Sequence, residues 1–419
     1  MVVDVNTNPV KGTKDYLPAE VVVRDYVKSL ILEVYRQNGF QRIETPMIES
    51  IERLDKSDGG ENLSLIFKIL KRGAKLDLAN QNLKENDLVD SGLRYDLTLP
   101  LARYYANNRH RLKNPFKVIQ VDKVFRAEKP QKGRLREFYQ CDIDVIGDES
   151  VAAEIELIYV TSEALLKLGF SNFVVRVNDR RILKNVIVSA GFDAGEVSSV
   201  CVSIDKLDKV GMDGVREELI TKGFDVGAVE NLVKIMADTS FGSFETLGEV
   251  CRETGVVEDL KRVVNISNEL ADGRYKVEYD KSLVRGMGYY TGMVFEIVVP
   301  SFGTSIAGGG RYDNMIGTFV KEQIPAVGFS IGFERITSIM LEGGMFKPEV
   351  AKTVAVIYGE DSRVADAIKK SNELKRQDYK VTIFKKATNP GKQLAYLEAE
   401  GFSYVCRLDE PGDLKPLKG

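Results

Sequence analysis

The sequence has few histidines and no closely spaced cysteines. It contains one histidine, His110, and four cysteines that lie far apart without CxxC or metal-ligand spacing. A single imidazole excludes every site that needs two, and it argues against a Ser–His–Asp or Cys–His mechanism. Dispersed cysteines favour reduced, inert thiols and predict no metal site. Any chemistry is therefore expected to depend on Arg, Asp and Glu side chains and on main-chain groups, with His110 at the surface.

Long apolar runs and a secretory signal are also missing. No run approaches the roughly 18 apolar residues that span a bilayer, and residues 1–10 have no basic stretch before an apolar core. These absences predict a cytoplasmic protein with no membrane association. The net charge of −3 gives no sign of nucleic-acid binding. From residue 351 onward, 13 basic and 10 acidic residues give +3, which suits a solvated surface and is merely compatible with an RNA partner.

Length and periodicity predict more than one domain. A chain of 419 residues is too long for one hydrophobic core. Apolar residues recur at helical spacing in 20–38, before a turn and strand that end at Pro46, and again in 151–170. Two strand patterns and a helix follow at 283–300, 325–331 and 334–341. This order predicts an α+β core with an antiparallel sheet, formed by residues 1–174 and 276–345 and split by a helical insertion at 175–275.

The C-terminal segment has a different pattern. After a linker at Lys347–Glu349, short apolar strands alternate with helices, which predicts a small parallel-sheet α/β domain at 351–419. The expected strands are 354–358, 381–384 and 402–406, and the expected helices are 361–375 and 392–400. The first of these helices is expected to turn Val364, Ile368, Ser371 and Leu374 inward.

Polar and apolar residues alternate in two segments, 94–99 and 140–146, which predicts a strand in each. Each strand would place its polar side chains on one face. These residues are Arg94, Asp96 and Thr98 in the first segment, and Gln140, Asp142 and Asp144 in the second. Such a face is either the wall of a binding site or a solvent-exposed sheet face, which is common in antiparallel sheets. The pattern alone leaves both open.

Three further segments contain arginine in a context that suits a ligand. Phe125–Arg134 predicts a hairpin with a cationic loop, in which Arg126 at the strand end could be held rigidly. Segments 285–292 and 307–313 combine arginine with glycine, which allows close approach of a carboxylate or phosphate. Taken singly, a charged hairpin is usually just solvated and glycine-rich segments are usually simple turns. No GxxxxGK[ST] loop occurs, so any ATP site is of another kind.

These segments together resemble the histidyl-tRNA synthetases along nearly the whole chain. Lys11–Pro18 resembles the N-terminal signature of that family. Three segments resemble motifs 1, 2 and 3 of class II synthetases: the helix leading to Pro46, Phe125–Glu128 with its loop, and Gly328–Arg335. Leu283–Gly292 and Gly308–Asp313 resemble the two stretches specific to histidine enzymes. The resemblance implies a class II antiparallel-sheet catalytic core, a helical insertion and an anticodon-binding-like C-terminal domain.

The resemblance also implies an activity and its residues. It implies a homodimeric enzyme that joins L-histidine to tRNA(His) through a histidyl-adenylate made from ATP with Mg²⁺. Arg126 and Arg285 would be catalytic, and ATP would contact Arg126, Glu128, Arg134 and Arg335. The histidine site would comprise Asp96, Thr98, Gln140, Asp144, Arg285, Tyr289, Tyr290 and Tyr312. Within it, Asp96, Thr98 and Gln140 would take the α-amino group, and Asp144 and Tyr290 the two imidazole nitrogens. Gln131 and Lys132 would contact the acceptor end of the tRNA.

Two other functions are compatible with a related fold. A histidine-binding regulatory subunit of ATP phosphoribosyltransferase would generally lack the anticodon-binding domain and the catalytic arginines, whereas Arg126, Arg285 and Arg335 are all present here. An adenylate-forming enzyme with another acceptor would not need the histidine-specific stretches.

The chain also departs from the pattern of many family members at two positions. It has Gly288 in place of an acidic residue and Asp96 in place of glutamate.

Overall fold

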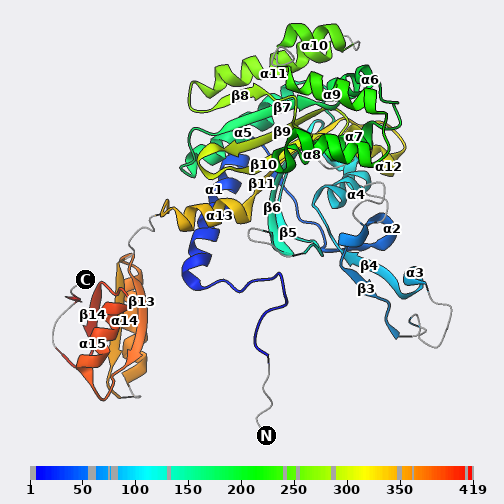
Figure 1. Cartoon of the computed structure of the whole chain (residues 1–419). Coiled ribbons are helices and arrows are strands. Elements are labelled where there is room, and N and C mark those ends of the chain that lie inside the picture. The colour runs from blue at the N-terminus through cyan, green and yellow to red at the C-terminus, as the bar shows by residue number, and fades with distance from the viewer. Residues whose placement is uncertain are drawn as a thin grey trace. The chain divides into compact units, whose positions relative to one another are not determined.

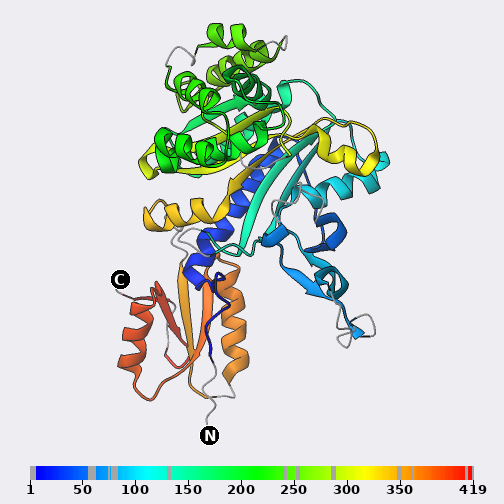
Figure 2. The ribbon, with the colours of Figure 1, turned by 45° about the vertical axis from the view of Figure 1, so that its right-hand side comes forward.

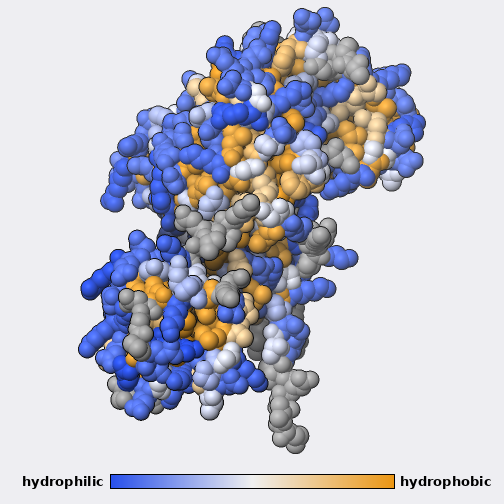
Figure 3. Space-filling model, turned by 90° about the vertical axis from the view of Figure 1, so that its left-hand side faces the viewer, coloured by the Kyte–Doolittle hydropathy of each residue, from blue (hydrophilic) through white to orange (hydrophobic). Residues whose placement is uncertain are grey.

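The chain forms two compact units, Met1–Met345 and Phe346–Gly419. The computed structural model describes residues 6–54, 63–73, 76, 84–129, 134–238, 243–251, 255–284, 289–346, 352–360, 363–410 and 414–417. Figure 1 shows a large sheet with helices in the first unit and a smaller sheet with two helices in the second. Within these residues, no helix is long and apolar enough to cross a membrane. The face drawn in Figure 3 is mostly hydrophilic, with apolar side chains in smaller patches.

The first unit is built on one large sheet. Its order, in the described part of the chain, is β1–β5–β6–β11–β10–β9–β7–β8. The strands are β1 (Gln41–Arg42), β5 (Phe116–Phe125), β6 (Glu137–Ile146), β7 (Val174–Asp179), β8 (Lys276–Tyr279), β9 (Met293–Val299), β10 (Thr304–Arg311) and β11 (Ala326–Gly332). Neighbouring strands are antiparallel except for the outer pairs β1–β5 and β7–β8. This confirms the predicted antiparallel core.

Three helices, α1 (Pro18–Gln37), α5 (Ala152–Lys167) and α13 (Phe333–Glu342), pack on the sheet and on one another. In Figure 2 the long helix α1 runs along the sheet beside α13. It begins with Pro18 at its first position, where the fixed φ of proline matches the helical backbone. It buries Val27 and Ile31 completely. The helices predicted at 20–38, 151–170 and 334–341 are thereby confirmed.

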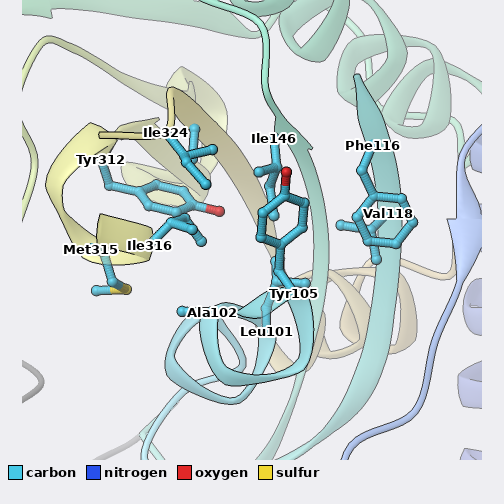
Figure 4. Packing of buried hydrophobic residues seen from close by; sticks show 11 residues of the cluster. Leu101, Ala102, Tyr105, Phe116, Val118, Ile146, Tyr312, Met315, Ile316 and Ile324 are labelled. Atoms are coloured by element: carbon cyan, nitrogen blue, oxygen red, sulfur yellow. The ribbon is translucent and has the colours of Figure 1, made fainter. Parts of the chain in front are cut away.

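A second group of helices packs on the sheet through an apolar cluster. Helices α4 (Thr98–Asn108) and α12 (Asp313–Val320) contact each other and meet β5, β6 and β11 there. Figure 4 shows this cluster, with Tyr312 lying close to α4 and to Ile146. Its members are Leu101, Ala102, Tyr105, Phe116, Val118, Ile146, Tyr312, Met315, Ile316, Ile324 and Ala326. The cluster fixes the position of α12 and therefore of the Tyr312 ring.

The predicted strand at 94–99 is wrong. Strand β4 (Val89–Leu93) ends before it, after pairing with β2 (Ile48–Ser50) and β3 (Lys68–Leu70) in a small separate sheet. Helix α4 begins at Thr98, because Asp96 Oδ1 accepts a hydrogen bond from the backbone N–H of Leu99 at 3.1 Å. Proline at position 100 is tolerated in that first helical turn. Short helices α2 (Ile51–Leu54) and α3 (Glu85–Leu88) flank the small sheet.

Between β7 and β8 the described chain is helical. The helices are α6 (Arg180–Ala190), α7 (Val197–Ile204), α8 (Leu207–Thr221), α9 (Val226–Ala237), α10 (Phe244–Val250) and α11 (Val256–Ala271). Figure 1 shows them gathered beside the β7–β8 edge of the sheet. The expected insertion boundary at residue 175 falls inside β7, since apolar Val175 and Val177 are sheet residues, and the helices start at Arg180.

The second unit is a four-stranded sheet in its described residues, with the order β13–β12–β14–β15. Strands β12 (Thr353–Tyr358), β13 (Lys380–Lys385) and β14 (Tyr404–Arg407) are parallel, and the short β15 (Lys415–Pro416) is antiparallel to β14. Helices α14 (Val364–Lys375) and α15 (Pro390–Ala399) complete the predicted α/β pattern. Ile368 was expected to face inward but is 48% exposed, because α14 buries Ala367, Ser371 and Leu374 on a face about 100° away.

One buried ion pair ties β10 to α5. Arg311, the last residue of β10, donates to both carboxylate oxygens of Glu154 at 2.6 and 2.7 Å. It also donates to the carbonyl oxygens of Asp148 and Ser150, just before α5. The Glu154 side chain is 1% exposed, so its charge has no access to water. Burial raises the pKa of Glu154, and the guanidinium of Arg311 opposes that rise.

We expect Arg311→Met to destabilise the protein by about 3–5 kcal/mol, because it leaves the Glu154 carboxylate buried without its partner. Urea denaturation measures the loss. The deficit should shrink as the pH falls, since the carboxyl can then take up a proton and bury no charge. Arg262→Met is the matched control, because Arg262 is 57% exposed in its pair with Asp259 and should change stability by less than about 0.5 kcal/mol. Equal effects of the two variants would contradict the role given to Arg311.

Candidate active site

A cavity of about 370 Å³ lies over the centre of the large sheet. Residues of β6, β10 and β11 line it, together with the ends of the β5–β6 hairpin and the start of α13. The cavity brings together most of the residues expected to bind ATP and histidine. Those that line it are Thr98, Arg126, Glu128, Arg134, Gln140, Asp144, Tyr289, Tyr290, Tyr312 and Arg335.

Four of the expected residues are not placed in the cavity wall. Asp96 is buried but is not among the lining residues, and its carboxylate caps α4. Arg285, Gln131 and Lys132 lie outside the residues that the structure describes. The strand alternation at 140–146 is confirmed as β6, and Gln140 and Asp144 both face the cavity, so this polar strand face is not solvent-exposed.

At one end of the cavity a carboxylate meets a phenol. Tyr312 donates its hydroxyl hydrogen to Asp144 Oδ1 at 2.7 Å, and both side chains are almost fully buried. Burial raises the pKa of Asp144 to about 7, with a contribution from the charge of Asp96, while the hydrogen bond from Tyr312 opposes the rise. Asp144 is therefore a group that changes its protonation state near neutral pH and can exchange hydrogen bonds with a ligand.

Glycine is needed opposite this pair. Gly328 of β11 faces Asp144 of β6 in the strand register, and a Cβ there would lie 2.0 Å from Asp144 Oδ1. A Cβ on Gly309 of β10 would lie 2.0 Å from the carbonyl oxygen of Gly328. The segment 307–313, which taken alone would most often be a turn, is strand β10 as far as Arg311. Because its glycines have no side chains, they leave the space above the strand open for the cavity.

Three tyrosines form an aromatic wall beside Asp144. The ring of Tyr289 lies edge-on to that of Tyr312 at 6.0 Å and tilted against that of Tyr290 at 4.8 Å. Burial raises the pKa of both Tyr289 and Tyr312 well above the ordinary value, so these phenols stay protonated and can donate. A planar, partly polar ring suits a pocket with this lining.

Arginines mark the other part of the cavity. Arg126, just after β5, lies over the rings of Tyr95 at 4.3 Å and Phe138 at 5.1 Å, and donates to the carbonyl oxygen of Tyr95. Arg335 in the first turn of α13 donates to the carbonyl oxygen of Ser305. Arg134 lies 3.5 Å from Glu128. These side chains are held by protein contacts, so their charge is in place before any anion binds.

The residues that fix α13 beside Arg335 could not be identified from local sequence patterns. Arg24 of α1 makes a two-pronged ion pair with Glu334, with one contact at 2.9 Å, and stacks over Tyr16 at 3.8 Å. The hydroxyl of Tyr16 and the backbone N–H of Tyr139 also donate to Glu334. Arg24 and Glu334 are 310 residues apart, so no local pattern could have paired them.

Asp142 also lies in the cavity, although no role was expected for it. It belongs to the alternating polar residues of segment 140–146. It lies on β6 between Gln140 and Asp144, lines the cavity and is 5% exposed.

The four cysteines are buried and not bonded to one another, and His110 is exposed, as expected. Among the described residues no group of three or more His, Cys, Asp or Glu could hold a metal ion.

Comparison with known sequences agrees with this geometry. A family model described as histidyl-tRNA synthetase matches residues 12–336. The histidine–tRNA ligase of Leifsonia xyli subsp. xyli is 38% identical over 426 residues, covering 98% of each chain. That of Cytophaga hutchinsonii is 33% identical over 416 residues, covering 96% of this chain and 92% of the relative. The similarity therefore includes both compact units.

Comparison with solved structures gives the same fold. The histidyl-tRNA synthetase from Nostoc sp. PCC 7120 superposes with a TM-score of 0.77 at 27% identity, covering 97% of this chain and 93% of that one. An ATP phosphoribosyltransferase regulatory subunit/histidyl-tRNA synthetase from Bacillus halodurans has a TM-score of 0.76 at 19% identity, which shows the fold alone. The family match over residues 12–336, with relatives more than 30% identical over nearly the full length, shows that the chain belongs to the histidyl-tRNA synthetase family.

Proposed function

We propose that the protein ligates L-histidine to tRNA(His) in two steps, through a histidyl-adenylate formed from ATP with release of pyrophosphate. The observation that carries this proposal is one cavity with a buried carboxylate–phenol pair in one part and rigidly held arginines in another. The names of the related histidine–tRNA ligases support it. ATP and L-histidine are the expected small substrates.

Histidine recognition would depend on Asp144 and the tyrosines. An imidazole has two nitrogens, of which one carries a hydrogen in the neutral ring, so a carboxylate and a phenol can satisfy both. Asp144 and Tyr290 would serve as these partners, with Tyr289 and Tyr312 beside the ring. A ligand without these nitrogens would leave buried polar groups unpaired, which a binding site rejects strongly. Asp96, Thr98 and Gln140 would take the α-amino group of histidine.

Adenylate formation would depend on fixed positive charge. Attack of the histidine carboxylate on the α-phosphate brings two anions together, which needs cations that are already in position. Arg126 would bind the α-phosphate, and Arg335 would pack on the adenine and the phosphates, with Arg134 and Glu128 nearby. Arg285 is proposed as a second catalytic residue that holds the histidine carboxylate and the α-phosphate. With both reactants held in the same cavity, correct positioning would supply much of the rate.

Magnesium is proposed to enter with ATP. Mg²⁺ is commonly held by substrate phosphates with one or two carboxylates, so the lack of a dedicated acidic cluster in the described residues is compatible with it. Glu128, which lines the cavity, would hold the ion and thereby help to neutralise the phosphates.

The remaining assignments are proposals from the family. Gln131 and Lys132 in the hairpin loop would contact the acceptor end of tRNA(His). Residues 1–174 and 276–345 would form the catalytic core, 175–275 a helical insertion domain and 351–419 an anticodon-binding-like domain. A homodimer through the first helix and a cytoplasmic location are also proposed. The exposed apolar side chains of Val21, Val22 and Tyr26 on α1 support a protein contact there.

We expect the protein to catalyse histidine-dependent exchange of pyrophosphate into ATP. Arg126→Ala should lower the exchange rate by about 100- to 1000-fold, because it removes one fixed donor to the developing charge. Arg109→Ala, a change at an exposed arginine paired with Glu322 outside the cavity lining, is the control and should leave the rate unchanged. Absence of exchange in the wild type, with histidine binding by calorimetry, would instead support a regulatory histidine-binding protein.

We also expect binding to depend on the ionisation of Asp144. The ligand for this test is a histidine analogue whose ring is a 1,2,4-triazole, which stays neutral between about pH 6 and 8. Because the pKa of Asp144 is about 7, lowering the pH protonates this acceptor, so affinity should fall by up to tenfold per pH unit below that value. Asp144→Asn should bind more weakly and show a smaller fall, because the remaining pH dependence then comes from other groups in the cavity, such as Asp142, whose pKa is also raised by burial. Calorimetric profiles that ran parallel in the two proteins would contradict the assignment.

A further inference from the structure

The connection between β8 and β9 passes the end of the strand that separates them. In the large sheet β7 lies between β8 and β9, parallel to the first and antiparallel to the second (Figure 1). Val177 of β7 pairs with Tyr279, the last residue of β8, and Asp179 pairs with Met293, the first residue of β9. The connection 280–292 therefore begins and ends beside the carboxyl end of β7.

Hydrogen bonds attach both described ends of this connection to the end of β7. On the β8 side, the side-chain amide of Asn178 donates to the carbonyl oxygens of Leu283 at 3.0 Å and Lys281 at 3.4 Å. On the β9 side, the backbone N–H of Arg180 donates to the carbonyl oxygen of Gly292 at 3.1 Å. The bonds to Leu283 and Lys281 come from a side chain, so a substitution can remove them without changing the backbone.

The amide of Asn178 is fixed in one orientation. Its Oδ1 accepts the backbone N–H of Asp179 at 2.8 Å, which leaves Nδ2 to face the two carbonyl oxygens. Asn178 is 1% exposed, and it is not among the described residues that line the cavity. Without the amide, the carbonyl group of Leu283 would be buried with no donor, and a shift of the backbone at Leu283 would relieve that cost.

The two ends of the connection are held independently. At the end near β9, the backbone N–H of Thr291 donates to the carbonyl oxygen of Arg311 at 2.8 Å. The hydroxyl of Thr291 accepts the backbone N–H of Asp313 at 3.1 Å. These bonds hold the residue that follows Tyr290, and they do not involve Asn178. Loss of the Asn178 amide should therefore disturb the end near Leu283 and leave the tyrosines in place.

We propose that Asn178 is a positioning residue for adenylate formation, which holds Leu283 and thereby places Arg285 against the histidine carboxylate and the α-phosphate. This assignment rests on the proposed function, which gives Arg285 that role. Arg285 follows Leu283 by two residues, whereas Tyr289 follows it by six. Asn178 thus acts on the reacting end of histidine and not on the imidazole, although it touches neither.

The first test measures histidine-dependent pyrophosphate exchange with the full-length protein. Asn178→Ala should lower kcat by about 10- to 100-fold, the effect of a small displacement of a reacting group. The KM for ATP should stay within about twofold of the wild-type value, because Arg126 and Arg335 are held by other elements. This separation of kcat from the KM for ATP is not expected from a general loss of stability.

Asn268→Ala is the matched control. The amide of Asn268 also donates to two carbonyl oxygens, those of Val264 at 2.9 Å and Val277 at 2.6 Å, and its oxygen accepts the backbone N–H of Val277. None of these bonds involves the connection 280–292. The control should lower the urea midpoint as Asn178→Ala does and leave the exchange rate unchanged.

The second test compares two ligands, L-histidine and L-histidinol, which has an alcohol in place of the carboxylate. By calorimetry, Asn178→Ala should weaken L-histidine binding by about tenfold, the value of one lost hydrogen bond to a charged group. L-Histidinol should bind as it does to the wild type, since it has no carboxylate for Arg285 to hold. In an Arg285→Ala background, adding Asn178→Ala should change neither affinity, because the positioned group is already absent.

Four outcomes count against the role of Asn178. They are a kcat of Asn178→Ala within about threefold of the wild type, equal losses for both ligands, the same loss of exchange in Asn268→Ala, and an undiminished effect in the Arg285→Ala background. These leave the proposed function standing, whereas absence of exchange in the wild type would reject both. If Asn178→Ala does not fold, Asn178→Leu repeats the comparison with a side chain of similar branched shape. Failure of both variants to fold would assign the amide a structural role only.

Discussion

Burial of carboxyl groups on the central strand β6 is the constraint that the surrounding structure accommodates. Asp142 and Asp144 both lie within the sheet with almost no exposure. An ionised carboxylate in such a place is strongly disfavoured unless hydrogen bonds or cations compensate it. Tyr312 provides one hydrogen bond to Asp144, and Gly328 leaves the space that its carboxyl group occupies. The packing of α12 against α4 then fixes Tyr312, so the apolar cluster of Figure 4 and the polar site depend on each other.

The positive side chains of the cavity are held in a different way. Arg126 makes no ion pair within the described residues and instead lies over two aromatic rings, Tyr95 and Phe138. Stacking holds the guanidinium without neutralising its charge, whereas pairing with Asp142 or Asp144 would neutralise both partners. Glu334, the residue before Arg335, pairs with Arg24. This ion pair joins α1 to α13, the helix that begins at the cavity. The N-terminal segment thus contributes to the site without lining it.

Much of this arrangement could be predicted from the sequence because it follows from local periodicity. The two-residue period of β6 places Gln140 and Asp144 on one face, and the motifs around Arg126 and Arg335 lie where a strand ends and a helix starts. At 94–99 the alternating pattern wrongly predicted a strand. In the structure α4 begins within this segment, and Asp96 accepts a hydrogen bond at its start. Periodicity also misplaced Ile368, because pattern alone did not show which side of α14 meets the sheet. The pairing of Arg24 with Glu334 depends on tertiary contacts, which no local pattern encodes.

The alternating pattern placed Asp96 on a strand and left Asp142 without a role for the same reason. Both are aspartates in alternating segments, and the sequence does not show which carboxylate is already hydrogen-bonded to the backbone. In the fold, one accepts a helix N–H and is compensated, while the other has an oxygen with no partner in the described residues. An uncompensated buried acceptor lowers the stability of the fold. Which carboxylate the fold compensates therefore depends on tertiary contacts and not on the alternating pattern.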